Sequence, residues 1–178
     1  MTGPRCHALT ARSQGMEGTS MLQSARRDKM IQPERQDVYR NRTKYEEPTV
    51  CSECGAVYEG GRWAWGTGPT GAARAVCPAC RRIAGRLPAG RVELSGDFFR
   101  AHRDEILNLV RNAEAAERDE RPMERIMAIA DGGGHTLVTT TGIHVARRIG
   151  ESLARSYQGA LDYRYGDGEA SIRVAWAR

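Results

Sequence analysis

The sequence predicts an α+β protein in three parts: a disordered basic arm over residues 1–47, a small cysteine-rich module over 48–90, and an α+β domain over 91–178. Three observations predict this division. The first part has no apolar periodicity, the second holds two cysteine pairs, and the third alternates between strand-like and helix-like apolar spacing. A chain of 178 residues, 40% of them hydrophobic, suffices for one compact domain and a small module.

The arm carries the excess positive charge of the chain. Residues 1–45 contain 9 Lys/Arg and 4 Asp/Glu, whereas residues 46–90 contain 5 and 4, and residues 91–178 contain 13 and 14. The net charge of +5 therefore belongs to the arm. Because the arm is rich in Gly, Ser, Gln and Arg, it cannot bury enough apolar surface to offset the entropy of ordering. Such an arm suits binding to nucleic acid, and equally a solubilising tail.

Four cysteines form two C-x-x-C pairs, Cys51 with Cys54 and Cys77 with Cys80, separated by 22 residues. Each pair predicts a tight turn that aims two thiolates at one point, and two such turns complete the tetrahedral sulfur shell that Zn²⁺ prefers. Disulfides would need an oxidising compartment, a thioredoxin-like site needs one pair, and an iron–sulfur cluster also accepts four thiolates. The paired spacing favours zinc, in a structural role because no position remains for a reactive water.

The glycine-rich segment between the pairs predicts a β-hairpin-like excursion, and with the pairs it makes a zinc ribbon with four cysteine ligands. Trp63 and Trp65 alternate, so in a strand they would face the same side. They suit either a cover for the metal core or a stacking surface for bases or a partner protein. The candidate contact residues of the ribbon are Arg62, Trp63, Trp65, Arg81 and Arg82.

The last part predicts the element order β-α-β-β-α-β-β, which is that of a ferredoxin-like split β-α-β sheet with an added edge strand. Apolar residues on both faces of residues 125–130 predict a central strand there. The predicted strands cover 91–94, 125–130, 136–141, 161–165 and 172–176, and the predicted helices cover about 95–118 and 142–157.

The helix over 142–157 is amphipathic. Its opposite ridge includes His144 and Arg148, which suit RNA phosphates, although pairing of Arg148 with Glu151 explains the pattern as well. The junction at 139–142 suits a phosphate at a helix start, or a plain cap. The predicted buried stripe consists of Ile143, Ala146, Gly150, Leu153 and Tyr157.

Several runs together resemble a short bacterial zinc-ribbon family: the two cysteine pairs, Gly61-Arg62-Trp63, the run 77–82, and the runs 139–148 and 157–163. At longer range the same order is similar to the N-terminal zinc-binding region of the large-ribosomal-subunit export adaptor (nonsense-mediated-decay protein three) family. The resemblance covers residues 47–176, although the adaptor carries more cysteine pairs. It implies attachment to ribosomal RNA or to a ribosomal particle.

No set of residues in the sequence predicts catalysis. The sequence therefore predicts a non-enzymatic zinc-binding adaptor that associates with RNA or ribosomal particles. The alternative is a protein–protein interaction module with a structural zinc and no role in nucleic-acid binding, which docks through the ribbon or through an edge strand over 171–176. No apolar run reaches the roughly 18–20 residues of a membrane span and no apolar segment follows the N-terminal arginine, so a cytoplasmic location is expected.

Overall fold

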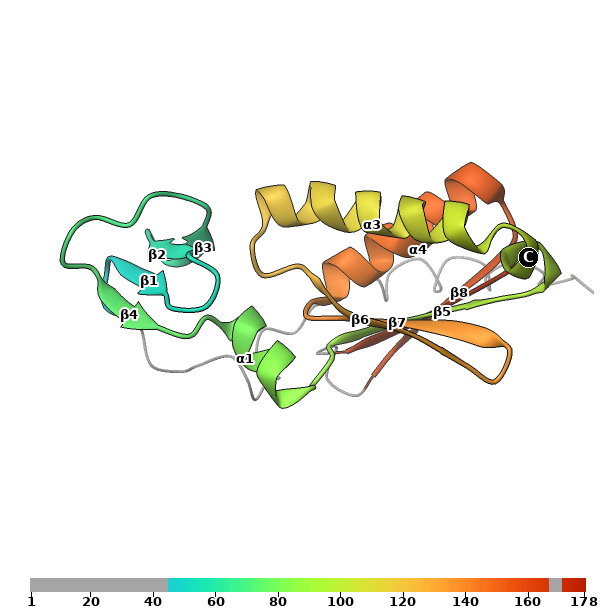
Figure 1. Cartoon of the computed structure of the whole chain (residues 1–178), viewed down its shortest axis with the longest axis horizontal. Helices are drawn as coiled ribbons and strands as arrows, with labels where there is room; N and C mark the ends of the chain where they lie inside the picture. Colours follow the sequence, from blue (N-terminus) through green and yellow to red (C-terminus); the bar gives the residue numbers. More distant parts are fainter. Residues whose placement is uncertain (1–44, 167–170) are drawn as a thin grey trace, which may run out of the picture. The chain divides into compact units, whose positions relative to one another are not determined.

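The structure is a computed structural model that describes residues 45–166 and 171–178. The predicted disordered arm, apart from its last three residues, lies outside the described residues. The described residues form two sheets with helices between and after their strands, so the predicted α+β class is confirmed (Figure 1).

The first sheet has four short strands in the order β3-β2-β1-β4. Strands β1 to β3 form an antiparallel meander, and β4 pairs in parallel with β1. Gly60 and Gly61 join β2 to β3 with φ of 59° and 77°, the positive values that a two-residue hairpin turn needs. The elements are β1 (Thr49–Cys51), β2 (Val57–Glu59), β3 (Arg62–Ala64) and β4 (Ala73–Ala75), followed by helix α1 (Pro78–Gly85).

Residues 45–47, placed in the arm by the sequence, contact this first sheet. The ring of Tyr45 lies with its centroid 5.2 Å from those of Tyr58 and Trp63. The backbone N–H of Gly60 donates to the carboxylate of Glu47 at 2.8 Å. The folded part of the chain therefore includes at least these three residues before β1.

The second sheet has five strands in the order β6-β7-β5-β9-β8. All seven elements expected after residue 90 are present, with the first helix broken at His102 into α2 and α3. The strands are β5 (Gly90–Ser95), β6 (Ile126–Gly132), β7 (His135–Thr140), β8 (Ala160–Tyr165) and β9 (Ile172–Ala177), and the helices are α2 (Asp97–Ala101), α3 (Arg103–Glu120) and α4 (Ile143–Tyr157).

Two strands occupy positions that the sequence analysis did not predict. Strand β9, expected at an edge, lies between β5 and β8 and runs parallel to β5. Strand β6, expected at the centre, is an edge strand that pairs only with β7. Its residues Ala128 and Ala130 are exposed. That face is apolar because it carries small alanine side chains, and it is not buried. Alternation of buried and exposed residues is the same in an edge strand and in an inner one, which is why it did not locate β9.

Helices α3 and α4 lie over one face of the second sheet (Figure 1). Between them and the sheet lies the main core, in which α4 buries Val145, Ile149 and Leu153. Of the predicted stripe, Ala146, Gly150 and Leu153 are buried, whereas Ile143 and Tyr157 are only partly buried. None of the helices in the described ranges is both long and apolar enough to cross a membrane. The sheet contributes Val92, Leu94, Val138, Ile172, Val174 and Trp176 to this core.

Candidate metal centre

The two cysteine pairs come together at one point. Their four Sγ atoms all lie within 4.8 Å of one another. The Sγ atoms of Cys51 and Cys80 are 3.9 Å apart, and those of Cys54 and Cys77 are 3.8 Å apart. The cluster is buried or half-buried, so the four thiols form a compact donor set that could hold a metal ion.

The first pair is positioned by the end of β1 and the turn that follows it. The backbone N–H of Cys51 donates to the carbonyl of Ala56 at 2.7 Å, and that of Gly55 donates to the carbonyl of Cys51 at 3.0 Å. Gly55 has a φ of 76°, a value that residues other than glycine rarely adopt. The glycine after the pair therefore closes the turn that brings Cys54 beside Cys51.

The second pair is positioned by the start of helix α1. Cys77 is the N-cap residue, and its Sγ accepts from the backbone N–H of Cys80 at 3.4 Å. Pro78 occupies the first turn of this helix, where its missing N–H costs nothing. A helix start stabilises a thiolate, because its free N–H groups carry partial positive charge. The cysteine pair predicts only a turn here, although proline directly after a cap position is a signal for the helix that follows.

The thiols differ in their ionisation. Burial disfavours the thiolate of Cys51, but three backbone N–H groups, that of Cys77 first among them, outweigh it and lower the pKa of Cys51 to about 6. Burial raises the pKa of Cys77, and the charge of neighbouring thiolates adds to that increase. Burial likewise raises the pKa of Cys80. A divalent cation among the four sulfurs would oppose both effects, so metal binding here would release protons.

Arg125, which directly precedes strand β6, brings a positive charge to the cluster. One terminal nitrogen of its guanidinium lies 3.0 Å from the Sγ of Cys54, and the other lies 3.5 Å from the Sγ of Cys80. Its Nε donates to the carbonyl of Pro122 at 2.5 Å, which fixes the orientation of the group. Burial opposes the charge of Arg125, yet the two thiols raise its pKa, so it stays protonated. Sequence reasoning missed this residue, because no local pattern connects it to a cysteine 71 positions away.

The two tryptophans make different contacts, contrary to the expectation of one shared surface. Trp63 packs against the cysteine cluster and beside Tyr58. Trp65, which is 41% exposed, donates from Nε1 to the carbonyl of Arg118 at 2.6 Å. The guanidinium of Arg125 lies 5.5 Å from the centroid of the Trp65 ring, as a cation–π contact. Trp65 and Arg125 thus connect the first sheet with the second domain.

The other predicted contact residues lie on separate elements. Arg62 is exposed on β3, and Arg81 donates to the hydroxyl of Tyr45 at 3.2 Å. Arg82 is only 7% exposed and donates to the carbonyl of Leu87, so its guanidinium supports the end of α1. His144 and Arg148 are exposed on α4, away from the cysteines in sequence.

Ion pairing on α4 also differs from the prediction. Glu151, expected to pair with Arg148, pairs instead with Arg147 at 2.8 Å. Arg148 lies in a shallow groove between α3 and α4 that is also lined by Glu105. Arg148 is therefore an exposed residue of the helical face and takes no part in the cysteine cluster.

The junction at 139–142, considered as a phosphate site, holds a carboxylate of the protein itself. The backbone N–H of Val145 donates to Oε2 of Glu124 at 2.9 Å, at the start of α4. A Cβ at Gly142 would overlap that carboxylate. The hydroxyl of Thr141 donates to the carbonyl of Met123 at 2.6 Å, so it too is used internally. The carboxylate of Glu124 therefore caps the N-terminus of α4 and occupies the position that a bound anion would take.

Glu124 gives a testable pH dependence. Burial raises the pKa of its carboxyl, and the N–H of Val145 offsets only part of that effect. A folded-state pKa above the unfolded value of about 4.3 means that the native protein binds more protons there. The contribution of Glu124 to stability is therefore full below about pH 4 and falls as pH rises through the folded-state pKa. In Glu124→Gln, which keeps an acceptor for Val145, we expect this dependence to vanish.

The measurement is the free energy of unfolding of wild type and Glu124→Gln, by denaturant titration across this pH range. The difference between the two profiles cancels the contribution of the cysteines, which both proteins share. Glu124→Ala is the control, since it removes the cap and should be less stable than Glu124→Gln by about 0.5–2 kcal/mol at every pH. Parallel profiles for wild type and Glu124→Gln would show that Glu124 titrates normally.

Comparison with known proteins identifies no family for this chain: no family model, no curated protein and no solved structure matches it. The chemistry of the site is therefore argued from its own geometry.

Proposed function

We propose that the four cysteines hold one structural zinc ion, in a non-enzymatic adaptor that associates with RNA or ribosomal particles. The observation that supports a bound metal ion is the distance between the sulfur atoms. A tetrahedron with Zn–S bonds of about 2.3 Å has edges of about 3.8 Å. The separations between Cys51 and Cys80, 3.9 Å, and between Cys54 and Cys77, 3.8 Å, match those edges. Since all four Sγ atoms lie within 4.8 Å of one another, they would have to move together only slightly to reach this geometry.

The donor set favours a single ion in a structural role. An iron–sulfur cluster places its own inorganic atoms between the thiolates, so it would hold the cysteine sulfurs farther apart than a single ion does. Four protein thiolates fill a tetrahedral shell, which leaves no position for a metal-bound water. The ion would therefore supply folding energy to the first sheet and no reaction chemistry.

The support for RNA as partner is the charge of the chain and the resemblance to the ribosomal adaptor. The net charge is +5, and nearly all of the basic residues are arginines, which form paired hydrogen bonds with phosphate. The alternative is a protein–protein module that docks through the ribbon or through the last strand, but β9 has a partner on both sides. That alternative would have to use an edge of the first sheet or the outer strands β6 and β8.

The experiment is co-sedimentation of the purified zinc-loaded protein with ribosomes. We expect association in about 50 mM salt and a steep loss by about 200 mM salt, because counterions are released when phosphates are neutralised. Nuclease treatment of the particles before mixing is the control that separates RNA from protein contacts. Failure to associate with ribosomes or with purified ribosomal RNA at the lower salt would refute the proposal.

A further inference from the structure

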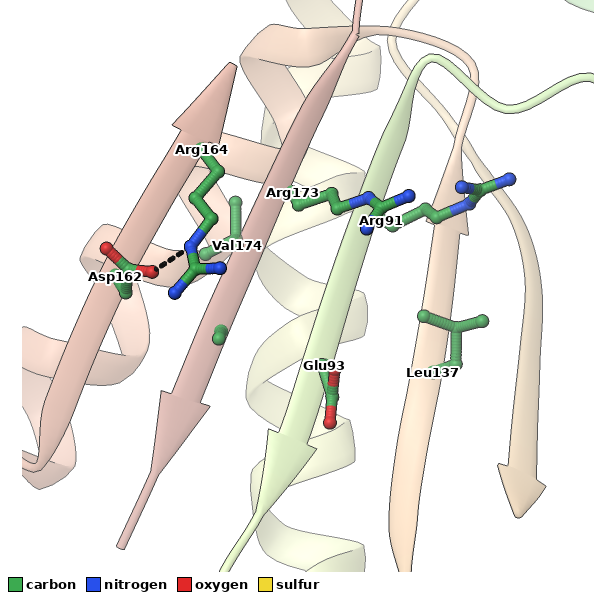
Figure 2. A pocket seen from close by; sticks show the side chains of 8 residues that line it. Arg91, Glu93, Leu137, Asp162, Arg164, Arg173 and Val174 are labelled. Carbon is green, nitrogen blue, oxygen red and sulfur yellow. Dashed lines mark hydrogen bonds and ion pairs between the residues drawn. The ribbon is translucent and has the colours of Figure 1, made fainter. Parts of the chain in front are cut away.

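The face of the second sheet that α3 and α4 do not cover has its charges in two rows that run across strands β8, β9 and β5. The arginine row consists of the register partners Arg164, Arg173 and Arg91. The carboxylate row lies two residues away on the same strands and consists of Asp162, Ala175 and Glu93. All six side chains are exposed, and Figure 2 shows the five charged ones on their strands.

Most of these charges have no partner within the described ranges, 45–166 and 171–178. Asp162 accepts from Nε of Arg164 at 2.8 Å. Arg91, Glu93 and Arg173 form no ion pair with any described residue. Arg91 and Arg173 are like charges directly opposite each other on paired strands, which destabilises a sheet unless a counter-charge accompanies them. One shallow depression of about 340 Å³ spans both rows, so a partner could reach all of these side chains.

The strands beneath the rows are of a kind that is usually covered on both faces. Strands β5 and β9 pair in parallel inside the sheet, and parallel strands occur mostly in sheets with both faces buried. The other side chains of this face are small or apolar over much of its area. They include Leu137, Ala128, Ala175 and Ala177. The face therefore offers a flat surface for a second layer, crossed by the two charged rows.

The two rows together select the partner. A polyanion or an acidic peptide on the arginines would meet the carboxylates of Asp162 and Glu93 about 7 Å away, since two residues of a strand span about that distance. The surface that neutralises both rows has a negative row and a positive row at the same spacing. The face itself has this pattern, because it alternates the two signs along the strands.

A two-fold axis that lies between two such faces, parallel to the rows and midway between them, brings opposite charges together. Each strand then runs antiparallel to its own counterpart, and the arginine row of each copy faces the carboxylate row of the other. Arg91 faces Glu93 of the second copy, and Arg164 faces Asp162 of the second copy. Arg173 lies between those two carboxylates. Such an aligned packing of two sheets about 10 Å apart is a common arrangement.

We propose that two copies of this chain associate face to face through the uncovered side of the second sheet, as a symmetric dimer with the same patch on both copies. The dimer would contain two pairs of Arg91 with Glu93 and two pairs of Arg164 with Asp162. Five strands of about six residues give each copy a footprint of about 24 by 20 Å, at the small end of specific interfaces. The association is therefore weak and depends on the ion pairs. It goes beyond the proposed function and does not rest on it.

The test exchanges charges between the rows. Arg91→Glu places two glutamates opposite each other at both symmetry-related positions, and Glu93→Arg places two arginines there, so each variant alone should be a monomer. In an equimolar mixture, the glutamates of the first variant face the arginines of the second, so a heterodimer should form. The double exchange in one chain should restore the homodimer. Neither RNA nor an acidic protein as the occupant of this face predicts that two monomeric variants bind each other.

The measurement is analytical ultracentrifugation of the full zinc-loaded chain from about 1 to 500 μM, the concentration range in which small interfaces dissociate. Each single exchange should weaken the homodimer about 10- to 100-fold, because it replaces two attractive pairs by two repulsive ones. An increase from about 50 to 200 mM salt should weaken the wild-type dimer as well. Arg111→Glu is the matched control, since it makes the same change at an exposed position of α3 and should leave the dimer unchanged.

Each result supports or overturns the proposal. A wild-type chain that stays monomeric up to about 500 μM in the lower salt would overturn it. A dimer that both single exchanges leave intact would show that another surface is used. Two monomeric variants that do not bind each other, although thermal unfolding shows both to be folded, would show that the rows do not face a second copy. Failure of the ribosome experiment would leave the dimer unaffected.

Discussion

Replacement of Cys77 by serine is expected to abolish zinc binding and to unfold residues 45–85, while the second sheet keeps its fold. Cys77 is fully buried, caps helix α1 and supplies one of the four thiolates. The buried core of the first sheet is very small: Cys51, Ala56, Cys77 and Ala79. Such a core cannot hold the sheet by apolar burial, whereas a structural zinc ion supplies about 10–16 kcal/mol at neutral pH.

The measurement combines metal content by mass spectrometry under native conditions with hydrogen exchange. We expect one zinc per wild-type chain, none in Cys77→Ser, and loss of amide protection in β1 to β4 with protection kept in β5 and β9. Cys6→Ser is the matched control, because Cys6 stands outside the two pairs and should change neither quantity. A Cys77→Ser protein that kept both its metal and the protection of β1 would contradict the assignment of the cluster.

The parts of this site that sequence reasoning reached are those that short-range pattern determines. Each C-x-x-C pair with its glycine or proline defines a local turn, and two turns with matching ligands imply that they meet. Arg125 has no such pattern. Its guanidinium reaches the sulfurs of Cys54 and Cys80 only because the tertiary structure brings the start of β6 close to the cysteines.

The fold divides in the same way. The element boundaries after residue 90 follow from apolar periodicity, which is a local property of each segment. The order of the strands is not local: β9 pairs with β5 across 82 positions, Gly90 with Ile172 for example. Arg91, Arg164 and Arg173 are ordinary exposed residues in the sequence, and only the insertion of β9 between β5 and β8 makes them neighbours.

Replacement of Arg125 by alanine is expected to lower the zinc affinity by about 10- to 100-fold without removing a metal ligand, the usual effect of losing a group that contacts the ligands. Four thiolates around Zn²⁺ leave a net charge of −2, half-buried beside the second domain. The guanidinium, 3.0 Å from the Sγ of Cys54, offsets part of that charge and donates to the sulfur. Without it, the thiolates would lose both a hydrogen-bond donor and a favourable charge, so protons would compete better with the metal.

The affinity is measured by competition with a chromogenic zinc chelator. Arg125→Lys separates the two contributions, because lysine keeps the charge but cannot donate to the sulfurs of Cys54 and Cys80 with a planar fork. It should therefore lie between wild type and Arg125→Ala. Arg121→Ala removes an exposed arginine paired with Glu117, four positions earlier, and should leave the zinc affinity unchanged. If Arg125→Ala bound zinc as tightly as Arg121→Ala did, Arg125 would serve only to join the two sheets, and the charge argument would be wrong.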